Sequence, residues 1–286
     1  MTLPNFLIIG AHKGASSSLR IYLGEHPDVF VAPVGEPSFF ALEGQARFRP
    51  DGTFTRPGME NAGATFTLEE YEALFAGVTS ERAVGEKSPA YLTNRDAPFR
   101  IRRLIPDVRL IAVLRNPVER AYSHYLMNVR SGQECLTFAD AVAAERHRQP
   151  MGAGLVRHYV RSGIYADRIE LYLSLFGPEK FRIYLYEDLV RDMSAIMREL
   201  YEYVGVDPAF TPDLTVRHNA RPTEHHNGRL RSRLSSLGRS MTTRDVAPTV
   251  SNGILLGTRK ELLSFYRDDI VRLQALIDRD LTGWLV

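Results

Sequence analysis

A lysine and a run of small or hydroxylated residues follow a short apolar stretch near the start of the chain. The apolar stretch covers residues 6–9, and the polar run after it consists of Lys13, Gly14, Ala15, Ser16, Ser17 and Ser18. Small residues let a ligand approach the backbone, and amides at the start of a helix attract anions, as do hydroxyls and an ammonium group. The segment predicts a phosphate-binding loop, although a serine-capped helix explains this segment alone equally well.

A second candidate anion site follows another apolar run. Residues 108–114 are apolar apart from one arginine, Arg115 comes directly after them, and Ser123 lies in the helix-like segment that follows. Ligands of open α/β sheets gather at the carboxyl ends of the strands, so we expect Arg115 beside the Lys13 loop. Alone, Arg115 could be a surface ion-pair partner and Ser123 an ordinary helix residue. Together with the first loop they favour a second phosphate site.

The order of residues in the loop argues against a nucleotide triphosphatase. In a P-loop, Gly-Lys-Ser/Thr closes the loop, whereas here Lys13 precedes Gly14. The apolar run that would carry a magnesium-binding aspartate ends instead in Arg115 and Asn116. A nucleotide kinase or ATPase is therefore kept only as an alternative. A nucleotide-binding module without chemistry is a further alternative, ranked below it.

The hydrophobic pattern predicts the elements that position these residues. Short apolar runs predict parallel strands, and helix-like patterns lie between them. The predicted strands are 6–9, 29–31, 83–86, 108–114 and 181–186. The predicted helices are 16–24, a helix that a Thr67–Glu70 capping box opens and that runs through Phe75, 117–130, 189–204 and 267–281. We expect an α/β fold of the P-loop-like, three-layer kind, with a central parallel sheet flanked by helices, in one domain over 1–286.

Composition limits the classes of partner. The 286 residues include 36 Lys and Arg against 34 Asp and Glu, so the net charge of +2 gives no general attraction to nucleic acid or anionic membranes. The apolar runs are too short for a membrane helix, and we see no signal peptide. The single cysteine, Cys135, fits a reducing compartment, so we expect a cytoplasmic protein. His225 and His226 are adjacent but lack a third metal ligand at a recognisable spacing, and we expect no metal.

The motifs resemble those of the sulfotransferases that use 3′-phosphoadenosine 5′-phosphosulfate (PAPS), especially the heparan sulfate branch and its bacterial relatives. Residues 13–17 are similar to the family's 5′-phosphosulfate loop, and residues 114–123 are similar to its 3′-phosphate motif. Residues 86–91 resemble a third family segment, and residues 281–284 resemble the end of its terminal helix, so the likeness covers most of the chain. Ala15 stands where relatives often have glycine, which we expect to be tolerated if its φ is negative.

The resemblance implies PAPS as the donor and adenosine 3′,5′-bisphosphate (PAP) as the product, with no metal. It implies Glu36 as general base, Lys13 as the cation that stabilises the leaving oxygen, and Lys87 as an orienting group. The implied donor contacts are Lys13, Gly14, Ala15, Ser16, Ser17 and Ser18 around the 5′-phosphate, Arg115 and Ser123 at the 3′-phosphate, and Arg217 and Arg221 in a loop above it.

The resemblance says less about the acceptor. It implies a small-molecule or glycan acceptor that offers a hydroxyl, with an amine as the second choice. Loops over residues 44–65 and 151–163 are expected to border the acceptor pocket. Neither the sulfated position nor the oligomeric state follows from the sequence.

Overall fold

A parallel sheet forms the centre of the molecule. The computed structural model describes residues 2–43, 65, 67–145, 158–215 and 253–286. Within them, five strands pair in the order β2-β3-β1-β4-β5, and every pair is parallel. Their bounds are β1 Phe6–Gly10, β2 Val29–Val31, β3 Ala83–Lys87, β4 Arg109–Leu114 and β5 Phe181–Leu185. The predicted α/β fold with a central parallel sheet is confirmed.

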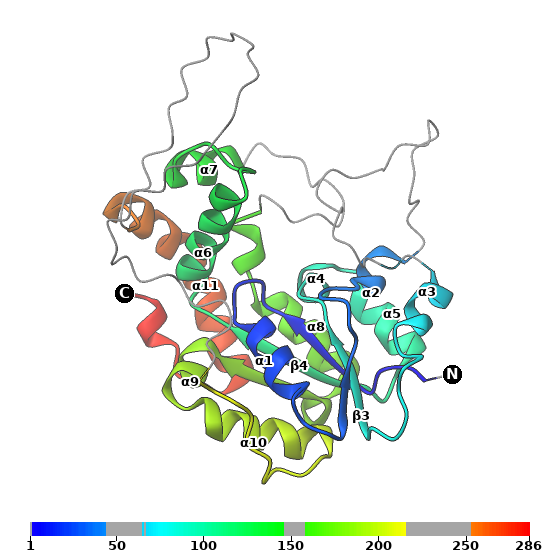
Figure 1. Ribbon diagram of the computed structural model, residues 1–286. Coiled ribbons are helices and arrows are strands. Elements are labelled where there is room, and N and C mark those ends of the chain that lie inside the picture. The colour runs from blue at the N-terminus through cyan, green and yellow to red at the C-terminus, as the bar shows by residue number, and fades with distance from the viewer. Residues whose placement is uncertain (1, 44–64, 66, 146–157, 216–252) are drawn as a thin grey trace, which may run out of the picture.

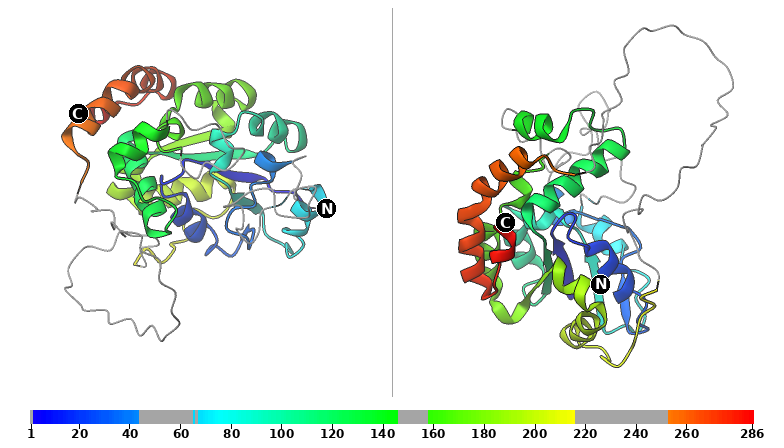
Figure 2. Two further views of the ribbon diagram at one scale, coloured as in Figure 1. Left: turned by 90° about the horizontal axis from the view of Figure 1, so that it is seen from above. Right: turned by 90° about the vertical axis from the view of Figure 1, so that its left-hand side faces the viewer.

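Helices cover both faces of the sheet (Figures 1 and 2). Because strand side chains alternate, Phe6 and Ile8 of β1 pack with α1 and α10, whereas Leu7 and Ile9 face the core of α5, α6, α8 and α11. The helices are α1 Ser16–Leu23, α2 Phe39–Leu42, α3 Leu68–Ala73, α4 Ala90–Thr93, α5 Ala97–Leu104, α6 Pro117–Arg130, α7 Phe138–Glu145, α8 Ala166–Phe176, α9 Tyr186–Arg191, α10 Met193–Val204 and α11 Leu256–Ile277. Short 3₁₀ turns occupy Arg161–Gly163, Pro178–Lys180 and Thr282–Trp284.

The helix predicted over 189–204 is two helices in the structure. Asp192 has non-helical backbone angles between α9 and α10, and its carboxylate accepts a hydrogen bond from the amide of Ala195 at 2.9 Å. An aspartate at this position satisfies an amide that the first turn of α10 leaves unpaired. The single-helix prediction was therefore wrong at Asp192.

The last helix begins earlier than its apolar spacing predicted. Helix α11 starts at Leu256 rather than at residue 267, and it ends before Asp278, which has a φ of 49°. Leu281 and Trp284 follow the helix and are buried against the main core. No helix in the part of the chain that the structure describes, α11 included, is long and apolar enough to cross a membrane.

Candidate functional site

The loop between β1 and α1 lies directly on the end of β4. The amide of Ala11 donates to the carbonyl of Val113 at 2.8 Å, and the amide of Gly14 donates to the carbonyl of Ala11 at 3.0 Å. A Cβ atom added to Gly14 would stand 2.2 Å from the oxygen of Val113. Glycine is required here because any side chain would push the loop off β4.

Ala15 does not meet the condition under which its methyl group would be free of strain. Its φ is 77° rather than negative, and Lys13 is also left-handed with a φ of 68°. A methyl group in this region costs about 1 kcal/mol. Ala15 is the N-cap of α1, and within the described residues no side chain caps that helix. The start of α1 thus offers its first amides, with the positive end of the helix dipole, to an anion.

Arg115 reaches this loop from the end of β4. Its Nη1 donates to the carbonyl of Lys13 at 3.3 Å, and its Cζ lies 4.4 Å from the centre of the Tyr186 ring. The hydroxyl of Tyr165 donates to the Arg115 carbonyl at 3.1 Å. The ring and the two hydrogen bonds therefore place the guanidinium beside the phosphate loop, as the sequence predicted.

Helix α6 differs from α1 in that a side chain caps its N-terminus. The Oδ1 atom of Asn116 accepts from the amides of Val118 and Glu119 at 2.9 and 3.3 Å. Ser123 is half-buried on α6, about two turns beyond Asn116. An anion beside Arg115 would consequently be bound by side chains rather than by the amides of α6.

Glu36 and Lys87 form an ion pair at the same edge of the sheet. Lys87 ends β3, and its Nζ lies 2.5 Å from Oε1 of Glu36, which comes from the segment after β2. The side chain of Lys87 is 5% exposed and that of Glu36 is 34% exposed. The lysine is thus fixed in the protein while the carboxylate keeps an open side.

His12 connects this ion pair with the phosphate loop electrostatically. Burial lowers the pKa of His12 to about 4, the Glu36 charge acts in the opposite direction, and Arg120, Lys87 and Lys13 lower it further. The charges of Glu36, Lys87 and Lys13, the three predicted catalytic groups, thus all act on the pKa of His12, so the three groups lie in one region. The Nζ atom of Lys13 itself lies 3.7 Å from the sulfur of Met127 on α6.

Two buried basic residues of α6, Arg120 and His124, lie near His12. The sequence analysis singled out none of these three residues. The ring of His124 stacks on that of His12 with centroids 6.2 Å apart, and burial holds the pKa of His124 well below its usual range. Arg120 is fully buried and donates from Nη2 to the carbonyl of Tyr159. No spacing in the sequence relates residue 12 to residues 120 and 124, because the fold alone brings them together.

Other predicted residues are not placed. Arg217 and Arg221 lie outside the described residues, as do residues 44–64 and 151–157 of the loops expected beside the acceptor. Among the residues that are described, no group of three or more His, Cys, Asp or Glu side chains could hold a metal ion.

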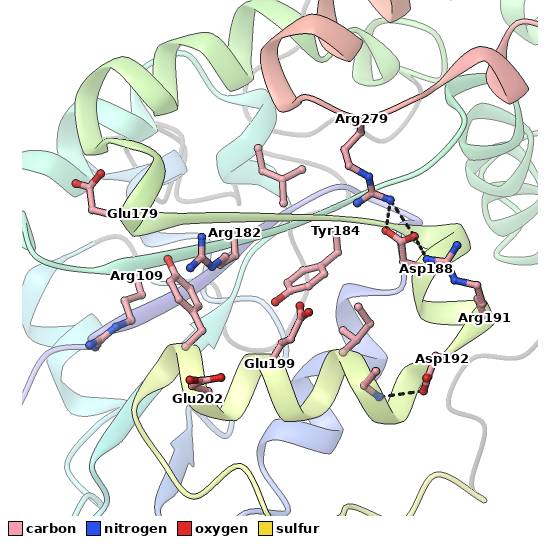
Figure 3. Close-up of a pocket in the computed structure, with 14 residues that line it drawn as sticks. Arg109, Glu179, Arg182, Tyr184, Asp188, Arg191, Asp192, Glu199, Glu202 and Arg279 are labelled. Carbon is pink, nitrogen blue, oxygen red and sulfur yellow. Dashed lines mark hydrogen bonds and ion pairs between the residues drawn. The ribbon is translucent and has the colours of Figure 1, made fainter.

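A cavity of about 1000 Å³ lies elsewhere, at the outer edge of the sheet beside β5 and α10. Its wall carries side chains of both charges, and Figure 3 shows Arg279 directed at Asp188 and Tyr184 facing Glu199. The residues that line it include none of the predicted site residues. The cavity is therefore separate from the candidate site, which lies where β1, β3 and β4 end.

Comparison with known proteins gives this site a context. A family model described as "Sulfotransferase family" matches residues 4–212. A crystal structure of a sulfotransferase from Alicyclobacillus acidocaldarius is similar with a TM-score of 0.79 and 32% identity, over 99% of both chains.

Two curated relatives act on heparan sulfate, according to their names. Human heparan sulfate glucosamine 3-O-sulfotransferase 6 is 30% identical over 73% of this chain and 54% of its own length. Mouse bifunctional heparan sulfate N-deacetylase/N-sulfotransferase 4 is 26% identical over 99% of this chain and 31% of its own length. The chain thus spans about half the length of the first of these relatives and about a third of the second.

Proposed function

The chain belongs to the sulfotransferase family, and from this premise we infer that it transfers the sulfuryl group of PAPS to an acceptor hydroxyl. The observation that carries the proposal is the meeting of the two anion motifs. Arg115, from one motif, donates to the backbone of Lys13 in the other at 3.3 Å. A nucleotide with phosphates at both its 5′ and 3′ positions would use both motifs at once.

Each phosphate of the donor has its own kind of site in this proposal. The open start of α1 and the hydroxyls of Ser16, Ser17 and Ser18 bind the 5′-phosphate, close to Gly14 and Ala15. Arg115 and Ser123 bind the 3′-phosphate through side chains, because Asn116 already occupies the first amides of α6. Arg217 and Arg221, which lie outside the described residues, are proposed as further cations for the 3′-phosphate. Such a site selects PAPS over nucleotides without a 3′-phosphate.

The reaction is an in-line displacement at sulfur. The acceptor oxygen forms a bond to sulfur as the bond from sulfur to the 5′-phosphate oxygen breaks, and the products are a sulfated acceptor and PAP. Glu36 takes the proton of the acceptor hydroxyl through the open side of its carboxylate. Lys13 stabilises the negative charge that develops on the leaving oxygen, and Lys87 orients Glu36 and the sulfuryl oxygens. The chemistry uses no metal.

We propose a glycan or other polyhydroxylated small molecule as the acceptor and the cytoplasm as the location. The glycan follows from the relatives named for heparan sulfate. A hydroxyl is preferred to an amine because a paired carboxylate is suited to removing a hydroxyl proton. The single, exposed Cys135 supports the cytoplasm, since it fits a reducing compartment.

Calorimetry with PAP, in the absence of metal, tests the donor site. We expect binding that is at least about 100-fold tighter than that of ADP or AMP, and loss of that preference in an Arg115→Ala, Ser123→Ala variant. Arg182→Ala is the matched control, since Arg182 also lies over a tyrosine ring, 5.1 Å from the centre of Tyr203. Binding of ADP as tight as that of PAP, or binding that needs Mg²⁺, overturns the proposal in favour of a kinase-like enzyme.

A further inference from the structure

A buried glutamate is the neighbour in sequence of Lys87, the lysine of the Glu36–Lys87 pair. Glu86 precedes Lys87 on β3 and is fully buried. Its Oε2 accepts from the hydroxyl of Ser88 at 2.7 Å, and its Oε1 accepts from the hydroxyl of Tyr71 at 3.3 Å. Burial raises the pKa of Glu86 to about 7, and the surrounding hydroxyls and the charge of Lys87 oppose that rise. Burying a carboxyl group is costly, so its hydrogen bonds call for an explanation.

Ser88 links Glu86 by hydrogen bonds to the segment that carries Glu36. Ser88 is fully buried, and its Oγ accepts from the backbone amide of Ser38 at 2.8 Å. A serine hydroxyl has one hydrogen, which Ser88 donates in its hydrogen bond to Glu86. A lone pair of the same oxygen accepts from the Ser38 amide. Glu86, Ser88 and Ser38 thus form a continuous chain of hydrogen bonds that ends two residues after Glu36.

The segment that this chain reaches needs to be held. Ser38 has a φ of 56°, a left-handed conformation that costs about 1 kcal/mol in a residue other than glycine. Upstream, Arg20 donates to the carbonyl of Ala32 at 2.7 Å, and in between the amide of Thr65 donates to the carbonyl of Pro37 at 2.9 Å. Glu36 itself is one-third exposed. Upstream of Glu36, the amide of Ala32 also donates to the carbonyl of Gly85 in β3 at 2.9 Å. Downstream of Glu36, the bond from Ser38 to Ser88 ties the segment to the residue directly after β3, the strand that bears Lys87.

We propose that Glu86 is a positioning residue, which acts through Ser88 to hold segment 36–38 so that the Glu36 carboxylate meets Lys87 and the acceptor. Glu86 touches neither donor nor acceptor in this proposal. The inference about catalysis rests on the proposed function, whereas the inference about the position of Glu36 does not. Two experiments separate them.

The first experiment measures the position without any substrate. A water-soluble carbodiimide joins a carboxylate to an amine that is in direct contact with it. The intact, folded protein is treated with this reagent and then digested, and mass spectrometry of the digest measures the yield of the Glu36–Lys87 amide. We expect the wild-type cross-link to fall about 10-fold in Ser88→Ala and in Glu86→Ala, and to persist in Ser88→Thr, which keeps the hydroxyl. Glu36→Gln gives no cross-link and shows that the product is specific.

The matched control is Glu134→Gln, which changes another buried glutamate that accepts from backbone amides and from Tyr159. We expect it to keep the wild-type cross-link. Circular dichroism spectra that match that of the wild type show that each variant is folded. If Glu86→Ala does not fold, the pair Ser88→Ala and Ser88→Thr carries the test. An unchanged cross-link in folded Ser88→Ala overturns the proposal.

The second experiment measures catalysis as a double-mutant cycle. We expect Ser88→Ala to lower kcat about 10- to 100-fold with an unchanged KM for PAPS, but to have less than about a twofold effect when Glu36 is already glutamine. An equal loss in both backgrounds means that Ser88 does not act through Glu36, and it overturns the positioning role. If the wild-type protein does not turn over PAPS at all, the proposed function fails while the cross-link still decides the position of Glu36.

Discussion

Two parts of the proposed site are built in different ways: the loop of residues 11–15, here called the donor side, and the segment of residues 36–38, here called the base side. On the donor side, backbone contacts with β4 shape the loop: the amide of Ala11 donates to the carbonyl of Val113, and Gly14 packs against the end of β4. On the base side, side chains fix the segment, since Glu36 is held by Lys87 and its neighbour Ser38 by Ser88. A substitution within the loop of residues 11–15 is therefore expected to act through the shape of the loop, whereas one on the base side acts through single hydrogen bonds.

The largest effect is expected from the carboxylate itself. Glu36→Gln keeps the size of the side chain but removes the proton acceptor, so kcat should fall about 10³-fold while PAP affinity stays within about twofold of wild type. Steady-state kinetics and calorimetry measure the two quantities. Equal loss of PAP binding would break the distinction between a base side and a donor side.

Gly14→Ala should have the next largest effect, and on the opposite quantity. The new Cβ would meet the Val113 oxygen at 2.2 Å, so the loop must shift, and PAP affinity should weaken about 10- to 100-fold. Gly257→Ala is the matched control because its Cβ would meet nothing within 4 Å. Wild-type PAP binding in Gly14→Ala would show that the loop is not shaped by β4.

The pH dependence of stability tests the environment of Glu86, which supports the base side. The pKa of Glu86 is raised to about 7 from a reference of 4.5, so the folded state holds this proton more tightly than the unfolded state. Its contribution is therefore present at low pH and is lost as pH rises from about 4.5 to 7. The free energy of unfolding of Glu86→Gln, relative to wild type, should rise by about 1–3 kcal/mol between those limits.

Denaturant titrations at several pH values provide that measurement. His12 and His124 have lowered pKa values and contribute with the opposite sign, but they are present in both proteins, so their contributions cancel in the difference. A difference that does not change with pH would contradict a raised pKa at Glu86.

The smallest effect is expected at the cavity beside β5. Arg279 donates to both oxygens of Asp188, at 3.0 and 2.8 Å, and is partly exposed. Arg279→Ala should lower the free energy of unfolding by less than about 1 kcal/mol and leave PAP binding unchanged. Thermal melting and calorimetry check both. Weakened PAP binding would show that the cavity is coupled to Arg115, since α9 carries both Asp188 and Tyr186, whose ring Arg115 contacts.

Much of the fold could be predicted because the relevant signals are local. Buried parallel strands produce continuous apolar runs, and the proline and the capping asparagine at the start of α6 are adjacent in the sequence. The break at Asp192 also had a local signal, an aspartate three residues before Ala195, but the apolar spacing on both sides obscured it.

The site was less accessible to sequence reasoning because its contacts are distant along the chain. The candidate phosphate loop could be proposed from its own residues, but Glu36 was selected only by resemblance, and its contact with Lys87 spans 51 residues. His12 and His124 meet across more than 100 residues. The left-handed conformation of Ala15 could not be predicted, because the fold holds a strained backbone that local propensity disfavours.

The central place of β1 also bears on how the protein is made. Strand β1 is synthesised before both of its neighbours, β3 and β4, which follow about 80 and 100 residues later. Until they leave the ribosome, five buried residues of β1 have no partner strand, and such segments are prone to aggregation. The phosphate loop cannot take its shape before Val113 arrives. A nascent chain stalled before β4 should therefore be a substrate for chaperones and should bind no nucleotide.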